Sequence, residues 1–119
     1  MDINFDNNIP IYIQLLEYIK TYIISGKLSP GDKLPSVREF SAMFKVNPNT
    51  MQKALTELEN EGLIYTERTN GKYVTNNKKI ISDIKNKYAK KIADEYFLCM
   101  NKIGINNLDA INYLKERKD

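Results

Sequence analysis

Two helix-start signals that lie close together constrain the fold of this chain more than any other feature. Residues 36–39 (SVRE) match a capping box, in which serine and glutamate side chains each accept a hydrogen bond from the other residue's backbone N–H. Asn47 is a preferred N-cap residue, and Pro48 suits the first position of a helix. This spacing predicts a short helix, a tight turn over residues 45–47, and a helix from Pro48 to about Asn60.

The segments on either side of this pair complete the order of elements. Residues 9–25 place apolar side chains at helical spacing before a glycine stop, and a loop follows over 27–35. The dipeptide Asn70-Gly71, a strong hairpin signal, lies between the strand-like runs LIYTER and KYVTN. The remaining chain predicts a linker over 76–79, an amphipathic helix over 80–103 and a short helix over about 107–117.

This order predicts an α+β fold that is mainly helical. Residues 1–75 are expected to form a winged helix-turn-helix domain of three helices and a two-stranded wing, and residues 76–119 to add two C-terminal helices. In such domains the second helix of the motif enters the major groove of DNA, and the hairpin reaches the backbone or the minor groove. A small α+β domain without a DNA role has the same order of elements, so the pattern alone leaves both interpretations open.

The composition excludes several classes of site. The chain has no histidine and a single cysteine, Cys99, which excludes a Cys/His zinc site, a disulfide framework and histidine-based catalysis. No metal, cofactor or enzymatic activity is therefore expected. Cys99 is interpreted as a small buried residue, with redox sensing as the alternative. The polar start and the absence of a long apolar run predict a cytoplasmic protein with no membrane partner.

Several motifs in order resemble the DNA-binding domain of the GntR family of bacterial transcription regulators. They are PIYIQ at 10–14, GKLSPGDKLPSVRE at 26–39, NPNT at 47–50 and LENEGLI at 58–64. The opening motif and the short tail are similar to the YtrA-like subfamily, whose members carry two C-terminal helices and typically act as dimers. The resemblance implies a sequence-specific repressor that binds a palindromic operator as a homodimer, often that of a transporter operon, with the effector unspecified.

Two rival functions stay open beside this resemblance. The same domain could bind a protein partner or RNA through its exposed asparagines and lysines, without specific promoter binding. An enzyme is the other rival, but the sequence offers no catalytic constellation.

The resemblance also implies which residues meet DNA. Arg38 matches an arginine that contacts base and backbone in the family, and a guanidinium can bind guanine O6 and N7 at once. A surface ion pair is the alternative role for Arg38. The complete predicted set is Lys33, Ser36, Arg38, Asn47, Asn49, Thr50, Gln52, Lys53, Arg68, Gly71 and Lys72.

Simpler roles compete for several members of this set. Asn47 could act only as an N-cap, and Gln52 and Lys53 could lie on a solvated helix face. Gly71 is needed for a plain hairpin turn in any case. Arg68 and Lys72 are the candidates for a narrow A·T minor groove, which attracts basic side chains.

The C-terminal segment presents a stripe of large side chains that predicts a dimer interface. The stripe consists of Ile84, Tyr88, Ile92, Tyr96 and Met100. Helix-turn-helix proteins commonly bind as two-fold dimers, and Met and Tyr are enriched at interfaces. The alternative is that the stripe packs on the chain's own winged domain. The lysines between 78 and 91 either add phosphate contacts or only solvate the helix.

The net charge of +3 is too small to identify a DNA-binding protein by itself. Its distribution is more informative. Residues 27–53 contain five basic and two acidic side chains, whereas Glu57, Glu59, Glu61 and Glu67 follow together. The near-neutral domain is therefore expected to have a basic reading face and an acidic far end.

Overall fold

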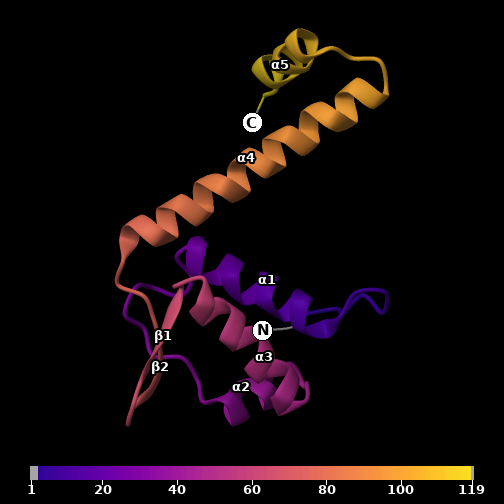
Figure 1. The fold of residues 1–119 in the computed structure, drawn as a ribbon. Coiled ribbons are helices and arrows are strands. Elements are labelled where there is room, and N and C mark those ends of the chain that lie inside the picture. The colour runs from indigo at the N-terminus through magenta and orange to yellow at the C-terminus, as the bar shows by residue number, and fades with distance from the viewer. Residues whose placement is uncertain (1–2, 119) are drawn as a thin grey trace. The chain divides into compact units, whose positions relative to one another are not determined.

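A computed structural model describes residues 3–118 of the chain. Its elements are α1 (Ile11–Ile24), α2 (Val37–Phe44), α3 (Pro48–Asn60), β1 (Ile64–Glu67), β2 (Gly71–Val74), α4 (Lys78–Lys102) and α5 (Asn107–Glu116) (Figure 1). Three helices and a two-stranded antiparallel wing precede two C-terminal helices, which confirms the predicted fold class.

The chain divides into two compact units, one that ends at Asp83 and one that begins at Ile84. The first turns of α4 therefore belong to the N-terminal unit. The Ile80 side chain contributes there, since its Cδ1 lies 3.4 Å from where a Cβ on Gly62 would be. The domain boundary between residues 75 and 76 stays a prediction.

The N-terminal unit is built on one apolar core between α1, α2, α3 and the wing. Its fully buried large side chains are Phe40, Leu15, Ile19, Ile23, Met51, Leu55, Leu58, Leu63, Ile64 and Val74. Burying each such side chain contributes roughly 1.5–3 kcal/mol. Ile11 is 44% exposed because it occupies the first turn of α1, outside this core.

A lysine on the core side of α1 is paired with the end of α3. The Lys20 side chain is 8% exposed, and its Nζ lies 2.9 Å from Glu61 Oε1 and 3.7 Å from Glu17 Oε1. Burying an ammonium costs free energy unless a carboxylate pairs with it. The pair therefore fixes the end of α3 to the middle of α1.

The two helix-start signals act as the sequence predicts. Ser36 Oγ accepts a hydrogen bond from Glu39 N at 3.1 Å, and Glu39 Oε1 accepts one from Ser36 N at 3.2 Å. Hydrogen bonding of the Glu39 carboxylate to Ser36, first to its side chain and then to its backbone N–H, holds the pKa of Glu39 below its usual value. At the next helix, Asn47 Oδ1 accepts a hydrogen bond from Asn49 N at 2.7 Å. Both caps orient the starts of α2 and α3, where the predicted DNA-binding residues lie.

The turn between these two helices contains the one strained backbone position of the described residues. Lys45 ends α2 with φ 56° and ψ 48°, a left-handed conformation that disfavours residues with a Cβ.

We expect Lys45→Gly to raise the free energy of unfolding by about 0.5–1 kcal/mol. Glycine removes the steric cost in the folded state, and this gain exceeds the loss that comes from a larger unfolded ensemble. Urea unfolding measures this difference. Lys45→Ala, which keeps the Cβ, is the matched control, and a glycine variant no more stable than the alanine variant would contradict the expectation.

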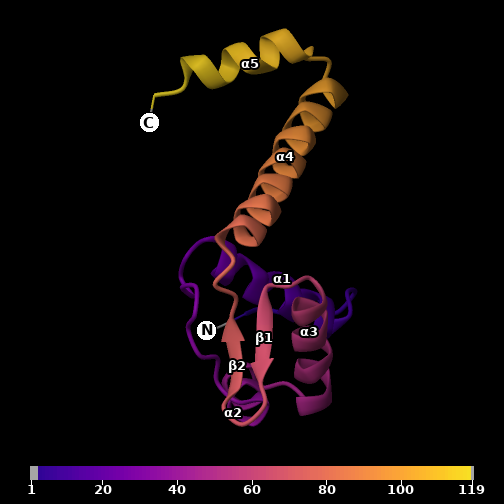
Figure 2. The same ribbon diagram turned by 60° about the vertical axis from the view of Figure 1, so that its left-hand side comes forward.

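The wing is wider than a simple hairpin. Its strands pair from Ile64 with Val74 to Glu67 with Gly71, and the 31–34 segment runs along the free edge of β2. There Leu34 N donates to the Lys72 carbonyl at 2.8 Å, and Val74 N donates to the Asp32 carbonyl at 2.8 Å. The predicted 27–35 loop is thus partly extended backbone, and it holds the start of α2 beside the wing (Figure 2).

The C-terminal unit has almost no core of its own. None of the α4 residues is buried, and among residues 84–118 only Ala110 is. The Tyr96 hydroxyl donates to the Ala110 carbonyl at 2.6 Å and so ties α5 to α4.

Cys99 is exposed, so the prediction of a buried cysteine is wrong. Cys99 lies on α4, and no residue of that helix is buried. No described helix is both long enough and apolar enough to span a membrane.

Candidate nucleic-acid interface

A groove of about 390 Å³ lies between the start of α2 and the wing. It brings together five of the residues predicted to bind DNA, namely Lys33, Ser36, Arg68, Gly71 and Lys72. These residues come from two separate stretches of the chain, 33–39 and 66–72, and the pairing of the 31–34 segment with β2 brings the two stretches together. The acids Glu39 and Glu67 also line the groove, so the basic side chains there are partly balanced.

Gly71 lies beside a basic side chain at the wing. Its φ is 111°, and Lys33 Cε lies 3.5 Å from where a Cβ would be. The aliphatic part of Lys33 therefore crosses the glycine on its way to solvent. The backbone conformation is therefore what requires glycine here, since a Cβ would make only an ordinary contact with Lys33.

Arg38 lies in the first turn of α2 and is exposed. Within residues 3–118 it has no ion-pair partner, so the alternative of a surface ion pair is not observed. A capped helix start with an unengaged guanidinium is a preformed anion-binding arrangement, because the free backbone N–H groups and the helix dipole add to the charge. The first turn of α3 is similarly open, with Asn49 exposed and Thr50 half-buried.

Two other predicted contacts on α3 already have intramolecular partners. Gln52 Nε2 donates to Thr56 Oγ1 at 3.2 Å, which directs the amide along the helix. Lys53 Nζ lies 4.0 Å from the centroid of the Tyr12 ring, a cation–π contact with α1. Such exposed contacts are worth about 0.5–1 kcal/mol, so a phosphate can displace them. Tyr12 thus positions a lysine of α3, a contact that the sequence did not reveal.

Lys72 is held more firmly. Its side chain is 17% exposed, and its Nζ donates to Thr66 Oγ1 at 3.0 Å and lies 3.7 Å from Glu59 Oε1. Thr66 Oγ1 in turn donates to Glu59 Oε1 at 2.5 Å. The ammonium that was predicted to reach the minor groove is therefore turned toward the last turn of α3.

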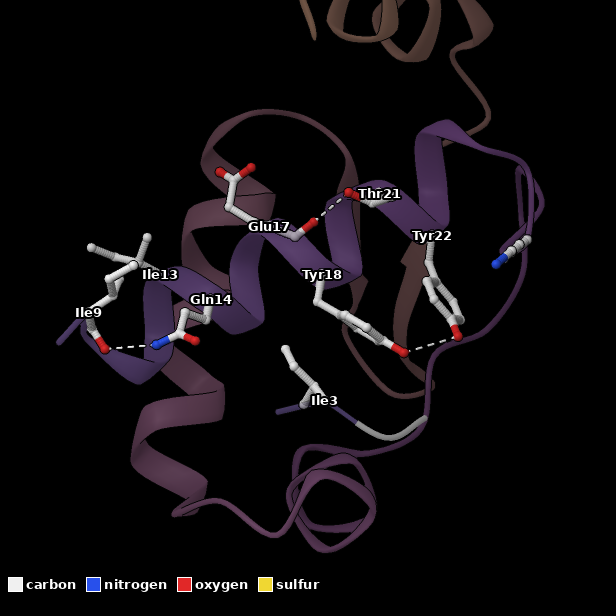
Figure 3. Close-up of a pocket in the computed structure, with 9 residues that line it drawn as sticks. Ile3, Ile9, Ile13, Gln14, Glu17, Tyr18, Thr21 and Tyr22 are labelled. Atoms are coloured by element: carbon white, nitrogen blue, oxygen red, sulfur yellow. Dashed lines mark hydrogen bonds between the residues drawn. The ribbon is translucent and has the colours of Figure 1, made fainter. Parts of the chain in front are cut away.

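A second, apolar pocket of about 610 Å³ lies along α1 and shares no lining residue with the groove of the wing (Figure 3). At its floor the Tyr18 and Tyr22 hydroxyls are 3.2 Å apart. At its edge Gln14 accepts from Asp6 N at 2.7 Å and donates to the Ile9 carbonyl at 2.8 Å. The glutamine of the opening PIYIQ motif therefore orders the segment that precedes α1.

Residues 11–74 match the family described as bacterial regulatory proteins of the gntR family. The chain is 33% identical over 115 residues to the uncharacterized HTH-type transcriptional regulator YhcF of Bacillus subtilis. This match covers 97% of this chain and 95% of YhcF. It is 49% identical over 70 residues to the HTH-type transcriptional repressor YtrA of the same organism, across 59% of this chain and 54% of YtrA.

Solved structures of bacterial regulators also resemble this chain. A GntR family transcriptional regulator from Listeria monocytogenes superimposes with a TM-score of 0.87 at 42% identity, over 96% of this chain and 100% of that one. The AraR DNA-binding domain in complex with operator ORX1 superimposes with a TM-score of 0.58 at 29% identity, over 63% of this chain and 95% of that domain.

Proposed function

The chain belongs to the GntR family of bacterial regulatory proteins, and from that premise we propose that it is a repressor that binds a palindromic operator as a homodimer. Family members are helix-turn-helix regulators that bind DNA, and the similarity to YtrA agrees with a YtrA-like protein. The family and these relatives are transcription regulators and not enzymes, as the sequence predicts.

The observation that supports this function best is the open pair of helix starts. Arg38 on α2 and Asn49 on α3 are both exposed, next to caps that hold the two helix ends in place. We place these ends in the major groove, with Thr50, Gln52 and Lys53 beside them. Arg68 and Lys33 then follow the backbone or the minor groove at the wing. Ser36 and Asn47 contribute mainly as caps.

Dimerisation is proposed from α4. A helix with a broad apolar face and no buried residue needs a partner, and Ile92 is 64% exposed in the middle of that face. A second α4 of the same chain is the simplest partner, and it would present two winged domains to the two half-sites of a palindrome. Tyr96 takes part through its hold on α5.

The regulated genes and the compartment follow as further parts of the proposal. An operator is chromosomal DNA, so we place the protein in the bacterial cytoplasm. We propose a transporter operon as the target, on the resemblance to the YtrA-like subfamily alone.

Binding to duplex DNA over a salt series tests the function. We expect tight binding to a fragment that contains the operator, selected from random duplexes or taken from upstream of the chain's own gene. The logarithm of affinity should fall with the logarithm of salt concentration by about 0.9 per phosphate neutralised. At physiological salt the specific site should be bound at least about 10³-fold more tightly than a random duplex. Equal affinity for both would reject a sequence-specific repressor.

A further inference from the structure

A three-residue network joins α3, the recognition helix that we propose enters the major groove, to both strands of the wing. Glu59 lies in the last turn of α3, Thr66 on β1 and Lys72 on β2. The Thr66 hydroxyl donates to Glu59 Oε1 at 2.5 Å and accepts from Lys72 Nζ at 3.0 Å, so it bridges the carboxylate and the ammonium. The two charges themselves are 3.7 Å apart.

The strand register explains why Lys72 turns inward. Thr66 and Lys72 are direct partners in the antiparallel pair, so their side chains lie on the same face. Ile64 and Val74, the next partners on that face, are buried in the core. The Lys72 side chain therefore continues the core-facing side of the wing toward α3, whereas Tyr65 and Tyr73 stack on the other face.

The charges favour this arrangement over a contact with DNA. The Lys72 side chain is only 17% exposed, and its ammonium donates to the Thr66 hydroxyl and forms an ion pair with the Glu59 carboxylate. A phosphate contact would require Lys72 to leave both partners and would leave Glu59 unpaired near the DNA. Among residues 3–118, Lys33 and Arg68, which line the same groove, form no ion pair of this kind, although Lys33 lies near enough to Glu39 to lower its pKa. Both remain available to phosphates.

From this geometry, and resting on the proposed DNA binding, we propose that Glu59 is a positioning residue that fixes the wing to the recognition helix and withholds Lys72 from phosphate contact. The network keeps the Lys72 charge away from the DNA phosphates, whose contacts add affinity for any sequence. It therefore lowers affinity for operator and random DNA alike, so that base contacts make up a larger share of operator binding.

The salt dependence of binding to a random-sequence duplex tests this role. Lys72→Gln should leave the slope of log affinity against log salt unchanged, because Lys72 neutralises no phosphate in the native protein. Glu59→Gln should steepen the slope by about 0.9, because the released ammonium gains one phosphate. The double variant Glu59→Gln/Lys72→Gln should return to the native slope. A Lys72→Gln variant whose slope is shallower by about 0.9 would overturn the proposal.

Glu57→Gln is the matched control, since Glu57 is an exposed acid on the same helix and its removal changes the net charge equally. An equal steepening in Glu57→Gln and Glu59→Gln would show a general charge effect and overturn the proposal.

Urea unfolding of the same variants without DNA provides a second readout. We expect the folding equilibrium constants of the single and double variants to depart from multiplicativity by a factor of about two to five, as for a partly exposed ion pair. Multiplicative effects would reject the network itself. A native protein that fails to bind the duplex while the cycle still shows coupling would reject the proposed function and with it the DNA role of Glu59, but not the network.

Discussion

Arg38→Ala is expected to weaken operator binding about 5- to 150-fold while the thermal unfolding midpoint stays within about 2 °C of the native value. The range corresponds to the roughly 1–3 kcal/mol that a bidentate arginine–guanine contact contributes to discrimination. Stability should not change, because Arg38 is exposed and has no ion-pair partner among residues 3–118. Fluorescence anisotropy on the operator fragment, with calorimetry on the free protein, measures both quantities.

Arg38→Lys separates geometry from charge. Lysine keeps the charge but lacks the planar fork, so we expect it to recover binding to a random duplex and to recover operator binding only partly. If lysine restores operator affinity fully, Arg38 makes only a phosphate contact. If alanine leaves operator affinity unchanged, Arg38 is not part of the interface and the placement of α2 on DNA is wrong.

The helices and the wing were predictable because their signals are local. The capping box at 36–39, the Asn47 cap and the Asn70-Gly71 hairpin signal each act over four residues or fewer. Both caps are present in the structure, and the hairpin forms with residues 68–70 as its loop and Gly71 as the first residue of β2. Local signals do not report how distant segments pair. The extended 31–34 segment was therefore predicted as a loop, although it completes the sheet beside β2 and assembles the groove.

The directions of long polar side chains were the least predictable part of the candidate site. Lys53 and Lys72 were both assigned to DNA from their places on α3 and at the wing tip. In the structure the Lys53 ammonium lies over Tyr12 of α1, a contact that a phosphate can displace, and the Lys72 ammonium lies beside Glu59 of α3. The chain brings both partners near only after it folds. For Lys72 a signal did exist, because it lies two residues from buried Val74 and so shares its face of the strand.

The expectation for Cys99 failed for a related reason. Helical periodicity describes which residues share a face of α4, but burial depends on whether anything covers that face. Within the single chain almost nothing from Ile84 onward is buried. Because the apolar face of α4 is uncovered in the single chain, a single substitution on that face should strongly affect the proposed dimerisation.

Ile92→Asp is expected to convert the proposed dimer to a monomer and to weaken operator binding about 10²- to 10⁴-fold. Ile92 is 64% exposed at the centre of the apolar stripe of α4, so an aspartate there would place an unpaired charge in the interface of two such helices. Two linked DNA-binding domains bind two half-sites far more tightly than one domain binds a single half-site, because the second contact is intramolecular. Sedimentation velocity measures the association, and anisotropy on the same samples measures the binding.

Asn86→Asp is the matched control for this substitution. It introduces the same charge on the same helix, on an exposed residue roughly 120° around the axis from Ile92. We expect this variant to remain dimeric and to bind the operator within about threefold of the native protein, which would attribute the effect of Ile92→Asp to its face of α4 and not to its charge. If Ile92→Asp stays dimeric, the chains associate through another surface, and the apolar pocket along α1 becomes the first place to examine. If it becomes monomeric but binds the operator as the native protein does, the two half-sites are not read jointly and the palindromic operator is wrong.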